Sequence, residues 1–150
     1  MFWFRFRSFH TTVALLAIVP FALACNDDPA DEGDPAEAVV AMRLTVGGQT
    51  ITISETGAVT GGPIVIPRAN TAIAAVFLDA ANAVVSGLDA EFRLEVTSDN
   101  ASIATFARIS AFAGTLTGVA AGQTTLRFAL FHVAENHEDF GFYPVPTTVQ

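Results

Sequence analysis

Residues 90–97 read AEFRLEVT and residues 123–133 read QTTLRFALFHV, and these two stretches decide the fold class. Apolar side chains occupy every second position through the middle of each stretch: Phe92, Leu94, Val96, Leu126, Phe128 and Leu130. Consecutive side chains of a strand point to opposite faces, so a period of two predicts strands with one buried face. One buried and one solvated face is the pattern of antiparallel sheets.

The rest of the chain from residue 39 onward follows the same rule, with apolar and β-branched runs cut by turn residues. Gly47-Gly48 predicts a tight hairpin, and the sequence DAAN at 79–82 predicts a second turn. The expected strands are 39–46, 49–54, 63–67, 71–78, 90–97, 102–109, 114–119, 123–133 and 142–149. Many short strands separated by turns predict an all-β sandwich or barrel.

The last expected strand carries two prolines, Pro144 and Pro146. Residues two apart in a strand face the same lateral side, so both missing N–H groups fall on one rim. Prolines are confined to edge strands, bulges and strand starts for this reason. The spacing predicts an edge strand whose outer rim cannot recruit another chain.

Three segments of residues 71–130 carry a family pattern: LDAAN at 78–82, SDNASIAT at 98–105 and GTLTGVAAGQTTL at 114–126. This stretch resembles the bacterial immunoglobulin-like (Ig-like) domain of group 2, found in invasin- and intimin-type proteins. The resemblance implies an Ig-like antiparallel β-sandwich, which we expect over residues 39–150. Members of that family are mostly spacers or adhesion modules and share no active site. The resemblance therefore implies a fold rather than a chemistry.

The first 24 residues are typical of a signal peptide. Residues 1–10, MFWFRFRSFH, carry two arginines and no acid, and an apolar run, TTVALLAIVPFALA, follows at 11–24. The run is shorter than the roughly 20 apolar residues that span a bilayer. A retained membrane anchor that recruits the aromatic residues 1–10 is the alternative.

Cys25 is the only cysteine of the chain and directly follows the apolar run. The residues Ala22-Leu23-Ala24-Cys25 resemble a lipobox, which implies cleavage before a lipidated Cys25 and a membrane anchor. They also satisfy the A-x-A pattern of ordinary secretion, which would give a soluble secreted or periplasmic protein. The position of the lone cysteine favours lipidation. Asn26 stands where Asp would signal inner-membrane retention in enteric bacteria, which favours the outer membrane by analogy.

Residues 26–38, NDDPADEGDPAEA, contain six carboxylates, two prolines and no large apolar side chain. This composition predicts a disordered acidic linker. Its spacing matches no EF-hand loop, so a spacer is favoured over a calcium site. All 15 acidic residues follow Cys25, with five arginines and no lysine, giving a net charge of −10. Such a charge repels phosphate backbones and argues against nucleic-acid binding.

One segment is dense in groups that bind metals: HVAENHEDFG at 132–141. We expect it to be a loop between the last two strands, with a histidine at the end of the first of them. Imidazole and carboxylate together suit zinc, copper or nickel. The alternative is a plain hairpin loop whose histidine continues the buried face of its strand. The candidate ligands are His132, Glu135, His137, Glu138 and Asp139.

The chain contains no G-x-S-x-G, H-E-x-x-H, P-loop or G-x-G-x-x-G motif, so we predict that it is not an enzyme. Two function classes remain. The first is a non-catalytic cell-envelope lipoprotein whose Ig-like domain serves as a binding, adhesion or spacer module, with a protein or glycan partner and no cofactor. The second is a small periplasmic metal-binding lipoprotein that uses the His132–Asp139 segment, with a divalent transition metal such as zinc or copper as cofactor.

Overall fold

The computed structural model describes residues 34–88 and 91–150, so the expected signal peptide and Cys25 lie outside the described residues. The described chain contains one short 3-10 helix and ten strands. In order they are η1 (Pro35–Ala38), β1 (Ala41–Val46), β2 (Gln49–Ser54), β3 (Val59–Thr60), β4 (Ile64–Ile66), β5 (Asn70–Leu78), β6 (Phe92–Ser98), β7 (Ala104–Ser110), β8 (Ala113–Gly118), β9 (Gly122–His132) and β10 (His137–Val149). Across these residues, no helix has the length and apolar character needed to cross a membrane.

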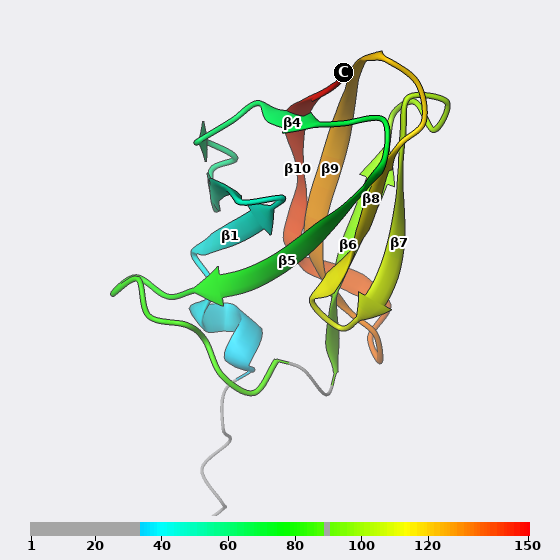
Figure 1. The fold of residues 1–150 in the computed structure, drawn as a ribbon. Helices are drawn as coiled ribbons and strands as arrows, with labels where there is room; N and C mark the ends of the chain where they lie inside the picture. The colour runs from blue at the N-terminus through cyan, green and yellow to red at the C-terminus, as the bar shows by residue number, and fades with distance from the viewer. Residues whose placement is uncertain (1–33, 89–90) are drawn as a thin grey trace, which may run out of the picture. The chain divides into compact units, whose positions relative to one another are not determined.

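The strands form two sheets, of order β3-β2-β1-β5-β8-β7 and β4-β10-β9-β6 (Figure 1). Ig domains place strands A, B, E and D in one sheet and C, F and G in the other. Here β1, β5, β8 and β7 follow the order A-B-E-D, while β6, β9 and β10 follow C-F-G, every pair being antiparallel. The predicted all-β, Ig-like sandwich is therefore confirmed. The smaller sheet is mixed, however, because β4 pairs with β10 in parallel.

All nine expected strands form, with shifts of a few residues at their ends. The expected hairpin at Gly47-Gly48 joins β1 to β2, and both glycines have positive φ, 53° and 93°. Such φ values favour glycine and match the twist of the flanking strands. The structure adds the two-residue strand β3 and begins β10 at His137 rather than at residue 142.

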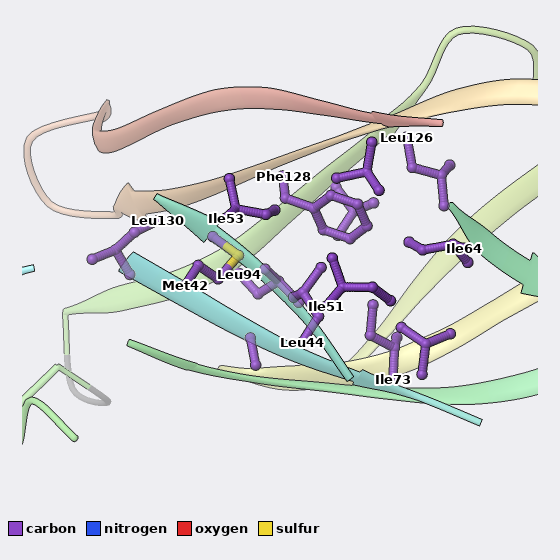
Figure 2. Packing of buried hydrophobic residues seen from close by; sticks show 14 of the residues in the cluster. Met42, Leu44, Ile51, Ile53, Ile64, Ile73, Leu94, Leu126, Phe128 and Leu130 are labelled. Carbon is purple, nitrogen blue, oxygen red and sulfur yellow. The ribbon is translucent and has the colours of Figure 1, made fainter. Parts of the chain in front are cut away.

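Apolar side chains from both sheets meet in one core (Figure 2). From the smaller sheet, Leu94, Leu126, Phe128 and Leu130 are fully buried. From the larger sheet they meet a second set of buried side chains, including Met42, Leu44, Ile51, Ile53 and Ile73. The period-two pattern of the sequence thus gives the buried face correctly.

The end of the expected linker, residues 34–38, is part of the fold rather than of the linker. Asp34 caps η1, its side chain accepting a hydrogen bond from the N–H of Ala36 at 2.8 Å. Ala36 and Val39 are buried in the common core. Residues 34–38, which were expected in the linker, therefore belong to the fold. Small residues such as Ala36 bury little area, which explains why composition alone assigned this segment to the linker.

The last strand is an edge over only part of its length. β4 pairs with Thr147–Val149 of β10. The prediction that β10 is an edge strand is therefore wrong for these three residues. Pro144 and Pro146 are in register with β9 and share the lateral side of Gln150, whose N–H donates to Ile66 O at 3.1 Å. The edge of β10 before Thr147, which β4 does not cover, therefore lacks two backbone N–H donors, as the proline spacing predicts.

Gly114 and Gly118 of the GTLTG segment are required because neighbouring backbone lies too close to leave room for a side chain. A Cβ at Gly114 would lie 2.6 Å from the carbonyl oxygen of Ala107 on the neighbouring strand. A Cβ at Gly118 would collide with the carbonyl oxygen of Pro67 and lie 2.8 Å from Val149 Cγ1. The most specific part of the family-like pattern thus reflects backbone packing.

Gly118→Ala should therefore destabilise the domain, by about 1–3 kcal/mol, because the added methyl forces backbone to move in a filled region. Gly141→Ala is the matched control, since no atom lies within 4 Å of a Cβ built there. Chemical denaturation of both variants measures the difference. Equal stability of the two variants would contradict the packing at Gly118.

Phe128 lies at the centre of the buried face of β9 and is fully buried. Phe128→Ala should lower the free energy of unfolding by about 3–5 kcal/mol, because it removes a large side chain and leaves a cavity. Ile109 is 75% exposed, so Ile109→Ala should have little effect. A loss near zero for Phe128→Ala in a urea titration would show that the strand register is wrong.

Candidate functional site

Four of the five candidate ligands, His132, Glu135, His137 and Asp139, gather around the turn that joins β9 to β10. His132 ends β9, His137 begins β10, and the two residues are paired across the hairpin. The N–H of Asn136 donates to His132 O at 2.9 Å, and Asn136 has φ of 57°, which Asn tolerates well. The expected loop is therefore only residues 133–136, and the expectation that His137 and its neighbours lie in a loop is wrong.

His132 continues the buried face of β9, and its side chain is only 7% exposed. The ring stacks on Phe92 with centroids 4.4 Å apart, which fixes its orientation. Nδ1 has no hydrogen-bond partner among the described residues. It lies 3.8 Å from Glu135 Oε2 and 3.7 Å from Asp139 Oδ2. A buried nitrogen without a partner faces two carboxylates, too far from either for a hydrogen bond.

His137 is half exposed and contacts the same two carboxylates. Its Nε2 lies 2.7 Å from Asp139 Oδ1, and its Nδ1 lies 3.5 Å from Glu135 Oε2. An ionised carboxylate only accepts hydrogen bonds, so Nε2 carries the hydrogen and donates it to Asp139. In the neutral ring, Nδ1 then presents its lone pair toward Glu135. Metal-binding histidines are commonly oriented in this way, by a carboxylate on the other nitrogen.

Glu138 does not join this group. It is paired with Phe131, so it alternates with His137 onto the outer face of the sheet. The strand register shifts between Glu138 and Phe140, which makes Asp139 an extra residue of a bulge. Bulges re-aim side chains, and this one lets Asp139 face His132 while Phe140 returns to the core. The sequence-based choice of Glu138 as a ligand receives no support from this geometry.

Two acidic residues beside His132 were missed by the sequence analysis. Asp34, the cap of η1, has a carboxylate oxygen within 4.8 Å of ligand atoms of His132 and Asp139. Glu91 Oε2 lies 3.7 Å from His132 Nε2. A signal for Asp34 was present, because Asp followed by Pro is a helix start. Its position in an acidic run concealed that signal.

Negative charge predominates at this end of the sandwich. Among the described residues, the carboxylates of Glu91, Glu135 and Asp139 make ion-pair contacts only with the two histidines. Arginines pair elsewhere: Arg93 and Arg108 with Glu95, and Arg127 with Asp99. Nitrogen and carboxylate donors under a negative field suit a divalent transition metal.

A second candidate is a hollow of roughly 350 Å³ beside the start of β9. It is lined by Pro63, Gln123, Thr124, Thr125, Pro146, Thr147 and Thr148, none of which is charged. The lining offers hydroxyl groups but no strong acid, base or metal ligand. The hairpin cluster is therefore the better candidate site.

Comparison with known proteins adds little. No family model and no curated protein matches the chain. Among solved structures, the chain is similar to the crystal structure of the S-layer protein SbsC, domains 4 and 5. The identity is 14% and the TM-score 0.40, over 73% of this chain and 76% of that chain. At these values the likeness carries no argument about function.

The hydrogen bond from His137 to Asp139 raises the pKa of His137 above 6.5, and the negative charges of Asp139 and Glu135 act in the same direction. This interaction stabilises the fold fully below the unfolded-state pKa near 6.5 and is lost as pH rises through the raised folded-state pKa. Asp139→Asn should therefore lower the pKa of His137 in an NMR titration with chelator present. Glu138→Gln is the control, and an unchanged pKa in Asp139→Asn would contradict the assignment.

Proposed function

We propose that the chain is a non-catalytic cell-envelope lipoprotein. In this proposal a lipid on Cys25 anchors it in a membrane, the outer membrane being favoured. Its single domain is of the bacterial group 2 Ig-like type and serves as a binding, adhesion or spacer module. The partner surface is a protein or a glycan rather than nucleic acid, because the mature chain has a net charge of −10.

The position of Cys25 carries this proposal. It is the only cysteine, and it stands between an apolar run at 11–24 and an acidic run that leads directly into the domain. A single cysteine in an exported chain has no internal disulfide partner, so it needs another role. Lipidation supplies that role and explains why the residue lies at this boundary.

The earlier start of the domain shortens the expected linker. With η1 in the fold, residues 34–38 no longer belong to the expected linker of residues 26–38. The hairpin cluster lies at the end of the sandwich where η1 begins, since Asp34 is close to His132 and Asp139.

A second candidate function is metal binding by a small periplasmic lipoprotein. The observation that favours it is the buried His132 Nδ1, which lies among carboxylates without a hydrogen-bond partner in the described residues. This candidate is compatible with a lipid anchor, and its argument is independent of one.

The lipid on Cys25 is tested by intact-mass measurement of the protein purified from membranes of an expressing bacterium. We expect a mass that corresponds to a chain beginning at Cys25 with added acyl groups, partitioning into detergent. Cys25→Ser should abolish both properties, because the thiol is the attachment point. A soluble product with an unmodified amino-terminal Cys25 would contradict the proposal and leave ordinary secretion.

A further inference from the structure

We propose a binding site for one divalent transition-metal ion at the β9–β10 hairpin. Its ligands are His132, Glu135 and His137, each of which offers one donor atom within 4.8 Å of the other two. The carboxylates of Asp34 and Asp139 lie beside this site and form a second group that shares His132. Bound metal thereby joins the two ends of the hairpin, beside the first turn of the domain. This inference holds whether or not Cys25 carries lipid.

The donor atoms stand close to the spacing of a tetrahedral site. Zinc bound at about 2.0–2.1 Å by nitrogen and oxygen places its ligand atoms about 3.3 Å apart. The observed separations are 3.5 Å for His137 Nδ1 to Glu135, 3.7 Å for His132 Nδ1 to Asp139, and 3.8 Å for His132 Nδ1 to Glu135. The donor atoms of His132, Glu135 and His137 lie within 4.8 Å of one another, so a modest contraction brings these three atoms to bonding positions and leaves one position for water.

The buried nitrogen of His132 distinguishes this site from an ordinary acidic surface patch. A buried polar atom without a hydrogen bond costs about 1–3 kcal/mol. Stacking on Phe92 holds the ring, so the nitrogen is directed at Glu135 and Asp139. A cation between these groups satisfies the nitrogen and neutralises the carboxylates at once.

Asp34 connects the site to the start of the domain. One of its carboxylate oxygens, Oδ1, accepts a hydrogen bond from the N–H of Ala36, which orients the side chain. A carboxylate oxygen of Asp34 lies within 4.8 Å of ligand atoms of His132 and Asp139. Carboxylates adjacent to the ligands typically change metal affinity about 10–100-fold. The cap of η1 therefore contributes to the metal affinity as well as to the helix.

The experiment titrates Zn²⁺ into the full chain in detergent, with Cys25→Ser so that no thiol competes. Isothermal titration calorimetry should give one ion per chain, and thermal unfolding should shift upward with zinc. A concentration 100 times the dissociation constant corresponds to about 2.7 kcal/mol. Ca²⁺ should not compete, since calcium prefers six to eight oxygen ligands.

Variants separate this site from adventitious binding. His137→Ala should weaken binding at least tenfold, because it removes a ligand but little packing, whereas replacing the buried His132 risks the fold. Glu138→Gln, which alters an acid on the outer face of the sheet, should leave the affinity unchanged. Zinc binding of equal strength in His137→Ala, or no binding in the parent chain, would overturn the proposal.

Asp34→Asn tests the connection to η1. Asn caps a helix as well as Asp, so the metal-free melting temperature should stay the same. The zinc affinity should fall about tenfold, because one carboxylate charge is removed. An unchanged affinity would remove Asp34 from the site and overturn the link between metal and domain entry.

Discussion

Burial of one face of β9 is the constraint on which the structure depends. β9 pairs with β6 on one side and β10 on the other, and its inward side chains Leu126, Phe128 and Leu130 meet the larger sheet in the core (Figure 2). Inward-facing positions of a strand repeat every two residues, so the next inward position after Leu130 is His132. A histidine is thus buried at the sandwich end by the register that buries the core.

The candidate site follows from that burial. His132 must satisfy its ring nitrogens at the edge of an apolar core, where an unmade hydrogen bond is costly. The hairpin turn, the bulge at Asp139 and the cap at Asp34 then bring acidic side chains to it from three parts of the chain. The result is a cluster of nitrogen and oxygen donors that no arginine among the described residues neutralises.

Much of the fold could be predicted from sequence because it depends on alternation and turn residues. The pattern around Phe92 and Phe128 predicted the buried faces, and Gly47-Gly48 predicted its hairpin. The start of β10 was missed because His137 begins a strand whose pairing depends on the partner β9 and on a bulge. Tertiary pairing of this kind leaves no local signal.

The site was predictable only where its residues adjoin in sequence. His132, Glu135, His137 and Asp139 cluster within eight positions, whereas Asp34 reaches them through folding. Glu138 was included because composition cannot tell the two faces of a strand apart before the register is known. The same alternation that predicts the core therefore excludes Glu138 once His132 and His137 are seen to pair.

The central claim is that the inward face of β9 directs the buried His132 Nδ1 toward carboxylates that can bind a metal ion together with it. Long-range proton–nitrogen correlation NMR on histidine-labelled protein reports directly which ring nitrogen carries hydrogen. We predict that the Nδ1 resonance of His132 moves when Zn²⁺ is added and that Nδ1 carries no hydrogen in the zinc-bound protein. An Nδ1 resonance that does not respond to Zn²⁺ would contradict the claim.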